Sequence, residues 1–265
     1  MPKERVDKLL VARGLCESRE RAQALVMAGQ VYAADQKVVK PATQVELDCP
    51  LEVRQGLAYV SRGGLKLEKA LDSFGLEVSG RAALDIGAST GGFTDCLLQR
   101  GARSVMAVDV GKGQLAWKLR QDARVHVLEK VNARYLTAEQ LPTPVEAVTA
   151  DVSFISLELI LEPVARLLAP EAWVVTLVKP QFEAGRRQVG KGGVVRDPSV
   201  HQQVIEKVMA CGARLGLVLS GLTHSPIQGP AGNIEYLLAF GGRPIDTSAE
   251  AVVRAAHLHF REQGV

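Results

Sequence analysis

The chain has 265 residues, of which 47% are hydrophobic and 23% are charged, an ordinary composition for a soluble folded protein. Its start, MPKERVDKLL, lacks the apolar segment of a secretion signal, and its most apolar run, AWVVTLV, is too short to span a bilayer. The four cysteines lie far apart without a C-x-x-C pair, which argues against a zinc site or a disulfide framework. We therefore expect a cytoplasmic protein with reduced thiols and no metal.

The net charge of +3 is placed unevenly along the chain. Residues 1–66 contain 11 Lys and Arg against 8 Asp and Glu, whereas the remaining residues contain 21 of each kind. The whole cationic surplus therefore lies at the front, which indicates that a polyanion would contact this part of the chain.

The first 58 residues have the pattern of a small α+β module. Apolar spacing in RVDKLLVARGL predicts a helix that ends at Gly14, and Ser18 is a suitable N-cap for a second helix that ends at Gly29. The segment QVYAADQKVVK alternates apolar and polar residues around a predicted turn at Asp35-Gln36, and LEVR repeats the strand pattern.

This front segment resembles the S4 RNA-binding domain through the string R-V-D-x-L-L…G…S-R-x-x-A…G-x-V…V-x-K-P, which covers about 50 residues. Helix-borne cations are the usual contacts to RNA phosphates, although five ordinary surface cations are the alternative explanation. The resemblance places the following five side chains on one RNA-binding surface: Arg5, Lys8, Arg13, Arg19 and Arg21.

From about residue 80 the pattern changes to alternating strands and helices, which predicts a doubly wound α/β sheet. In such sheets the ligand lies beyond the carboxyl ends of the strands. The seven predicted strands are 82–86, 103–109, 125–128, 146–150, 172–178, 216–222 and 234–240.

The first predicted strand ends in a glycine-rich turn, LDIGASTGGFTD. The turn lacks the Lys-Ser/Thr of a phosphate loop and the G-x-G-x-x-G of a dinucleotide site. Asp109 ends the second strand, 22 residues after Gly87, where a carboxylate can bind both ribose hydroxyls. Asp85 precedes the turn and suits a ligand with an ammonium group, so S-adenosylmethionine is the expected cofactor, and a purely structural turn is the alternative. The predicted cofactor-binding residues are Asp85, Gly87, Ala88, Ser89, Thr90, Gly91, Gly92, Phe93, Asp109 and Asp151.

Four charged residues from distant segments converge on the same edge of the predicted sheet. Asp151 follows the fourth strand, and Lys179 closes the fifth. Glu235 lies at the start of a last strand that we expect to be antiparallel, and Lys66 lies in the first turn of a helix antiparallel to the first strand. Each of them alone has the simpler explanation of a solvated charge.

These four residues resemble the K-D-K-E tetrad of FtsJ-type ribose 2′-O-methyltransferases, and an S4-like module joined to such a domain resembles the TlyA family, also called haemolysin A. The segments that carry the resemblance span nearly the whole chain: SRGGLKLEKAL, GASTGGFTD, GQLAW, ADVSFISL, LVKPQFE, GGVVRDP and GNIEY. The resemblance implies a Rossmann-like class I methyltransferase domain with a seven-stranded sheet whose last strand is antiparallel. It also implies methylation of cytidine ribose in ribosomal RNA, free or in ribosomal subunits.

The chain departs from the family in the linker, where GLAYV stands in place of an Arg-x-Trp-Val segment that some members carry. This departure puts in doubt any coupling between RNA contact and cofactor binding that such a segment provides.

Transfer of a methyl group to a ribose hydroxyl requires alignment of the reacting atoms and removal of a proton. Lys179 is the expected base, since burial beside a second cation, Lys66, favours a lysine that gives up its own proton. Asp151 and Glu235 would orient the two lysines, and the pattern leaves open which acid pairs with which lysine.

The expected domain boundaries are 1–58 for the S4-like domain, 59–64 for a linker, 65–245 for the methyltransferase domain and 246–265 for a C-terminal helix. The Gly-rich stretch 183–198 is interpreted as a mobile loop that closes over RNA, with an ordinary surface loop as the alternative. Arg62, Arg186 and Arg187 complete the predicted RNA contacts, and the five histidines are assigned no role.

Two other functions stay open from the sequence. One is a membrane-active haemolysin, against which the apparent lack of a signal or spanning segment argues. The other is a non-catalytic RNA-binding assembly factor, which would have no need for two lysines facing two acids.

Overall fold

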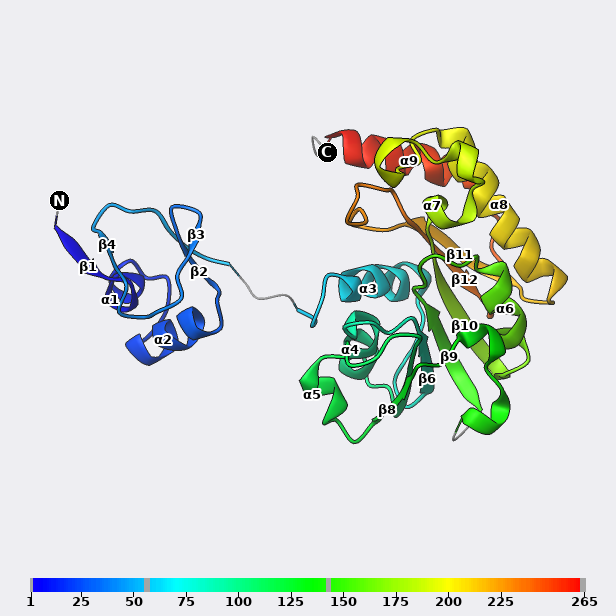
Figure 1. The fold of residues 1–265 in the computed structure, drawn as a ribbon, viewed down its shortest axis with the longest axis horizontal. Coiled ribbons are helices and arrows are strands. Elements are labelled where there is room, and N and C mark those ends of the chain that lie inside the picture. Colours follow the sequence, from blue (N-terminus) through cyan, green and yellow to red (C-terminus); the bar gives the residue numbers. More distant parts are fainter. Residues whose placement is uncertain (1, 55–57, 142–143, 263–265) are drawn as a thin grey trace. The chain divides into compact units, whose positions relative to one another are not determined.

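The computed structural model describes residues 2–54, 58–141 and 144–262. The chain forms two compact units, residues 1–58 and 59–265, each with its own buried core (Figure 1). The linker residues Gln55, Gly56 and Leu57, which include the start of GLAYV, lie outside the described residues.

The described residues contain no helix with the length and apolar character needed to cross a membrane.

The first unit contains two helices and two small antiparallel sheets around a core that includes Val6, Leu10 and Val26. The second helix starts as predicted, because the Ser18 hydroxyl accepts a hydrogen bond from the backbone N–H of Arg21 at 3.2 Å. The elements are β1 (Lys3–Arg5), α1 (Val6–Ala12), α2 (Arg19–Met27), β2 (Val31–Ala33), β3 (Gln36–Lys37), β4 (Gln44–Glu46) and β5 (Leu51–Val53).

The hairpin turn between β2 and β3 lies one residue earlier than predicted. Its central residues are Ala34 and Asp35, with φ angles of 44° and 65°. Two consecutive left-handed residues match the twist of the flanking strands, and Val38 donates its backbone N–H to the carbonyl of Val31, so both valines enter the core. The predicted turn position, Asp35-Gln36, was therefore wrong, because burial of this valine pair sets the register between β2 and β3.

The second unit is built on one seven-stranded sheet with the order β11-β12-β10-β9-β6-β7-β8. The last strand, β12, is antiparallel to both neighbours, and β10, β9, β6, β7 and β8 run parallel, which confirms the predicted fold class. The strands are β6 (Ala82–Ile86), β7 (Ser104–Asp109), β8 (Val125–Glu129), β9 (Val145–Ala150), β10 (Leu168–Val178), β11 (Leu219–His224) and β12 (Tyr236–Phe240).

Helices cover both faces of this sheet and create two separate cores (Figure 1). One core contains α3 (Gly63–Phe74) and α4 (Gly92–Gln99), and the other contains α6 (Glu158–Ala165), α8 (Pro198–Arg214) and α9 (Ala249–Glu262). The shorter elements are α5 (Trp117–Arg120), η1 (Ala133–Tyr135), η2 (Ala138–Gln140), α7 (Pro180–Glu183), η3 (Arg186–Gln188) and η4 (Lys191–Gly193).

Two strand starts differ from the predictions in ways that bear on the site. The strand expected from residue 216 begins at Leu219, because α8 extends to Arg214 and Gly216 then turns the chain with φ of 77°. The strand expected from residue 234 begins at Tyr236, so Glu235 lies just before the ladder.

Candidate active site

The glycine-rich turn after β6 depends on glycine at two positions. Gly87 and Gly91 have φ angles of 81° and 97°, which favour glycine. A Cβ atom at Gly87 would lie 2.3 Å from the backbone oxygen of Asp151, and one at Gly91 would lie 2.2 Å from a methyl group of Leu119. The turn therefore packs directly against the chain that leaves β9.

Asp109 is held beside this turn at the carboxyl end of β7. Its carboxylate accepts hydrogen bonds from the backbone N–H groups of Ser89 at 2.8 Å and Gly111 at 2.7 Å. The carboxylate is half-buried, Ser89 and Thr90 are exposed, and the carboxylate oxygens keep lone pairs for two ribose hydroxyls. These residues fit the adenosine part of S-adenosylmethionine.

Asp85 and Phe93, two of the predicted cofactor-binding residues, are buried, and their contact with a cofactor stays a prediction. Asp85 is fully buried, and its carboxylate accepts hydrogen bonds from the hydroxyls of Thr94 at 2.6 Å and Thr149 at 3.0 Å. This burial raises the pKa of Asp85 to about 6. Phe93, in the first turn of α4, is buried in the core that α3 and α4 share.

The first lysine of the predicted tetrad forms a buried ion pair across the edge of the sheet. Lys66 lies in the first turns of α3, and its Nζ is 2.5 Å from Oε2 of Glu235. Both side chains are almost entirely removed from solvent. An ion pair in such a place costs much desolvation free energy, so it requires close geometry of this kind.

The second lysine pairs with the other acid. Lys179 follows β10, and its Nζ lies 2.6 Å from Oδ1 of Asp151 and donates a hydrogen bond to the Ser153 hydroxyl at 3.0 Å. The structure thus gives two pairs, Lys66 with Glu235 and Lys179 with Asp151, which sequence spacing left open.

Backbone contacts place the second pair next to the glycine turn. The N–H of Asp151 donates to the carbonyl of Ile86 at 2.9 Å, which extends the β6–β9 ladder to the point where Gly87 begins the turn. A cofactor held by this turn and a proton acceptor at Lys179 would therefore lie at the same edge, as methyl transfer to a hydroxyl requires.

Sequence reasoning missed the residue that holds the loop between β9 and α6. Glu183, at the end of α7, is buried, and its carboxylate accepts hydrogen bonds from the Leu157 N–H at 2.6 Å and the Ser156 hydroxyl at 2.7 Å. Lys207 of α8 lies 3.3 Å from the same carboxylate. The sequence feature that could have indicated Glu183 is its position in LVKPQFE, four residues after Lys179.

The same loop presents an aromatic ring that was also missed. Phe154 is 89% exposed and has a φ of 63°, which is unfavourable for a bulky residue. Its ring centroid lies 4.7 Å from that of Phe182, and Lys179 Nζ lies 5.9 Å from the Phe182 centroid. An exposed ring in a strained backbone conformation, packed against Phe182, is suited to contact a planar ligand.

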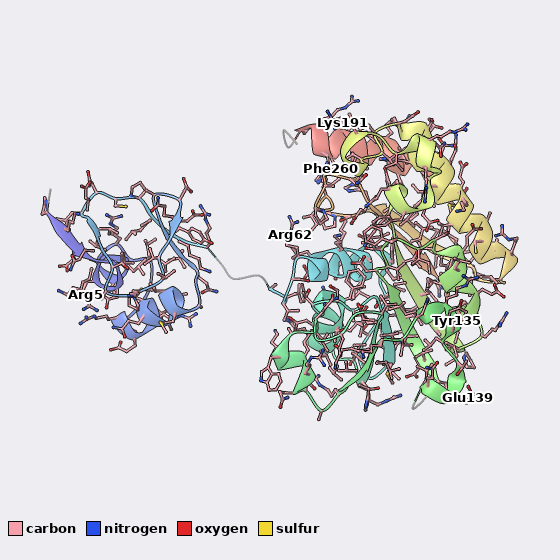
Figure 2. The ribbon with its side chains drawn as sticks, viewed as in Figure 1. Arg5, Arg62, Tyr135, Glu139, Lys191 and Phe260 are labelled. Carbon is pink, nitrogen blue, oxygen red and sulfur yellow. The ribbon has the colours of Figure 1, made fainter. Side chains whose placement is uncertain are left out.

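Two of the predicted RNA-binding arginines share one buried acid in the first unit. Arg5 binds the Asp7 carboxylate through two N–H groups at 2.8 and 2.9 Å, and Arg19 donates to the same carboxylate at 3.0 Å. A further hydrogen bond comes from Gln23, and Arg5 is the main cause that lowers the pKa of Asp7 far below its usual range. Because two guanidinium groups share one carboxylate, a net positive charge is held at a fixed position. Arg5 is labelled in Figure 2.

The other predicted cations of this unit differ in how firmly they are held. Arg13 donates to the backbone carbonyls of Leu47 and Cys49, and Lys8 lies 3.4 Å from Glu4. Arg21 is exposed and has no side-chain partner among the residues the structure describes.

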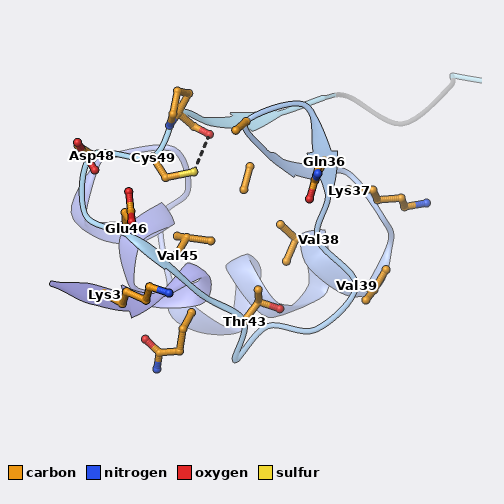
Figure 3. A pocket seen from close by; sticks show the side chains of 14 residues that line it. Lys3, Gln36, Lys37, Val38, Val39, Thr43, Val45, Glu46, Asp48 and Cys49 are labelled. Carbon is orange, nitrogen blue, oxygen red and sulfur yellow. Dashed lines mark hydrogen bonds between the residues drawn. The ribbon is translucent and has the colours of Figure 1, made fainter. Parts of the chain in front are cut away.

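A cavity of about 660 Å³ lies on the same unit (Figure 3). Its lining includes Lys3 and Lys37 but also Glu46 and Asp48. Because these charges balance, the cavity does not define a phosphate site.

The remaining predicted RNA contacts lie in the second unit and are exposed: Arg62 before α3, and Arg186 and Arg187 in η3. The stretch 183–198 contains two short 3-10 helices, and its far end is bonded to Asn233. Asn233 accepts a hydrogen bond from the Val195 N–H at 3.0 Å and donates to the Gly193 carbonyl at 2.9 Å. Closure of this loop over RNA stays a prediction.

No group of three or more His, Cys, Asp or Glu side chains suitable for a metal ion occurs within residues 2–54, 58–141 and 144–262. The four cysteines are free thiols.

A doubly wound sheet with an antiparallel last strand, a glycine turn after β6 and an acid at the end of β7 is the arrangement of Rossmann-like methyltransferases. Residues 59–242 match the family model of FtsJ-like methyltransferases, and residues 4–48 match that of the S4 domain. The chain therefore belongs to the FtsJ-like methyltransferase family, and its cofactor is S-adenosylmethionine.

Similar proteins match along most of the chain. YqxC of Bacillus subtilis is 54% identical over 89% of this chain and 85% of its own length. The 16S/23S rRNA (cytidine-2′-O)-methyltransferase TlyA of Mycobacterium tuberculosis is 50% identical over 88% of each chain. A solved structure from Streptococcus thermophilus, named as a hemolysin, has 48% identity and a TM-score of 0.77 over 100% of this chain and 99% of its own.

Proposed function

We propose that this protein transfers a methyl group to the 2′-hydroxyl of cytidine ribose in ribosomal RNA of one or both subunits. The observation that carries the proposal is the pair of lysine–carboxylate contacts, Lys66–Glu235 and Lys179–Asp151, at the sheet edge that also holds the glycine turn. The relative from M. tuberculosis, named for this reaction, supports the choice of substrate.

Some residues of the site bind the cofactor, and others position the substrate hydroxyl and accept its proton. S-adenosylmethionine, when bound, supplies the methyl group from its sulfonium. The glycine turn holds the cofactor, and Asp109 accepts hydrogen bonds from its ribose. Lys179, once it has lost its own proton, accepts the proton of the substrate hydroxyl, while Asp151 and Ser153 fix the position of its Nζ.

The Lys66–Glu235 pair has a different role, because both members are buried and close to each other. Lys66 donates to the substrate ribose or its oxygen as negative charge develops there, and Glu235 holds the lysine in place. Phe154 offers its exposed ring for stacking on an unstacked base of single-stranded or looped RNA.

The S4 unit supplies affinity for RNA through its cationic surface, with Arg5 and Arg19 held by Asp7. A ribosomal substrate, as free RNA or within a subunit, also places the protein in the cytoplasm.

Neither alternative function accounts for the site. A membrane-active protein or a non-catalytic RNA-binding factor has no use for two lysine–carboxylate pairs that are costly to bury.

The test maps the 2′-O-methylated positions in 16S and 23S rRNA from three strains. One strain lacks the gene, one carries the wild-type gene in its place, and one carries Asp151→Ala. We expect at least one cytidine to be methylated only with the wild-type chain. Identical maps in all three strains would overturn the proposal.

A further inference from the structure

A second cavity, of about 430 Å³, opens between three segments of the second unit. One wall comes from residues 194–196 at the end of the Gly-rich loop, and another from the loop before β12, which includes Gln228 and Gly232. The third wall is α9, through His257 and Arg261. Figure 2 labels Lys191 of the loop and Phe260 of α9 at the same end of this unit.

The lining of this cavity is cationic. Arg196 and Arg261 supply the positive charge, and none of its lining residues is acidic. Neither guanidinium has an ion-pair or hydrogen-bond partner within the described part of the chain. Burial, together with the nearby charge of Arg261, lowers the pKa of His257 and favours its neutral ring. An anion here would therefore meet the uncompensated charge of the two guanidinium groups.

The cavity adjoins the reactive edge of the sheet. Its lining residue Ile234 directly precedes Glu235, and a Cβ atom at Gly229 of the same loop would lie 2.5 Å from Oε1 of Glu235. The side chain of Asn233 joins two of the walls through its hydrogen bonds to Gly193 and Val195. The loop before β12 therefore contributes both to the wall of this cavity and to the surroundings of Glu235.

We propose that this cavity binds a backbone phosphate of the substrate RNA next to the target nucleotide, an inference that rests on the proposed function. Guanidinium groups bind phosphate oxygens through paired N–H donors, and a phosphate contact fixes the register of a nucleic acid without reading its bases. The C-terminal helix, which lies beyond both matched family models, thereby becomes part of the substrate site.

The test uses the full chain, an rRNA fragment with the mapped cytidine, and the variants Arg261→Gln and Arg196→Gln. Each variant should raise the KM for RNA by about 10-fold, while the Kd for S-adenosylmethionine is retained. The slope of RNA affinity against salt concentration should also become less steep, by the amount expected for the loss of about one phosphate contact.

Arg254→Gln is the matched control. Arg254 lies on the same helix and carries the same charge, but it does not line this cavity, and its Nη1 lies 3.8 Å from Oε1 of Glu250. Its KM should equal that of wild type. Equal KM values for Arg254→Gln and Arg261→Gln would overturn the inference.

A second arm identifies the bound group. Methylphosphonate linkages, which remove the phosphate charge, are introduced one at a time around the target cytidine. One of them should weaken RNA binding by wild type but not weaken RNA binding by Arg261→Gln any further. The absence of such a linkage would overturn the inference. Inorganic phosphate should shift the His257 imidazole resonances of wild type less strongly in Arg261→Gln. A phosphate shift with an unchanged KM for RNA would assign the cavity to a free anion instead. A wild-type chain that methylates no cytidine would contradict the proposed function, and the phosphate shift would still report on the cavity.

Discussion

Lys179 is held at the carboxyl end of β10 by an ion pair with the Asp151 carboxylate and a hydrogen bond to the Ser153 hydroxyl. This arrangement fixes its Nζ but does not by itself distinguish a proton acceptor from a group that only positions the substrate. The distinction depends on whether the side chain can lose a proton, which lysine can do and arginine cannot at accessible pH.

We therefore expect both Lys179→Ala and Lys179→Arg to lose methyl transfer by roughly 10²- to 10⁴-fold, the usual contribution of a positioned base. Single-turnover rates measure the loss, and calorimetry with S-adenosylmethionine should show unchanged cofactor binding in both variants. Substantial turnover by Lys179→Arg would leave the lysine a positioning role only.

Asp85 provides a second test at the scale of one residue. Its pKa in the folded protein is raised to about 6, above that of an unfolded aspartate, because burial disfavours the charged form. The folded state therefore binds the extra proton, and the free energy of unfolding falls as pH rises from about 4 to about 6.

Asp85→Asn removes this penalty and should stabilise the protein at pH 7 by up to about 3 kcal/mol, with no gain below pH 4. Urea denaturation between pH 4 and pH 8 measures the difference. Because the side chain does not face solvent, affinity for S-adenosylmethionine should change little. A large loss of cofactor affinity without a change in stability would restore Asp85 as a direct ligand.

At the scale of elements, the loop from β9 to α6 carries Ser153 and Phe154, and α7 holds it through Glu183. The bonded groups are buried or half-buried, so the carboxylate is the partner that their N–H and O–H groups require. The geometry around Lys179 therefore depends on an acid that does not contact the reacting atoms.

Glu183→Ala should reduce the free energy of unfolding by about 2–3 kcal/mol, because it leaves the Leu157 N–H unpaired. It should also lower kcat more than it raises the KM for RNA. Glu158→Ala is the matched control: Glu158 also pairs with Lys207, at 3.1 Å, but near the surface, where such a pair contributes about 0–1 kcal/mol. Equal effects of the two substitutions on kcat would contradict a positioning role for Glu183.

At the scale of the whole molecule, each unit has its own core, so each can be studied by itself. The second unit contains the glycine turn, Asp109 and both lysine–carboxylate pairs. The first unit has 9 Lys and Arg against 8 Asp and Glu, and its residues 4–48 match the S4 domain.

We expect residues 59–265 alone to bind S-adenosylmethionine with the affinity of the full chain but to methylate rRNA at least about 10-fold more slowly, because the phosphate contacts of the first unit are lost. RNA affinity of the full chain should fall as salt rises, with a steeper slope than that of the isolated second unit. Methylation by the truncated chain at the full rate would show that the S4 unit does not contribute to substrate binding.

Local patterns in the sequence were sufficient to predict much of this protein. The alternation of apolar strands and helices predicted the doubly wound sheet, since burial of apolar faces follows the period of each element. Topology then brought Lys66, Asp151, Lys179 and Glu235 to one edge, because the ends of parallel strands meet there whatever their distance along the chain.

Only the tertiary structure decided how side chains at that edge meet. It paired Lys179 with Asp151 and Lys66 with Glu235, turned Asp85 into the core, and placed Glu183 beneath the active loop. These outcomes depend on burial and on distances of a few ångströms between segments that are remote in sequence. A pattern of residue types specifies which element a side chain belongs to, whereas its partner is set by the packing of several elements at once.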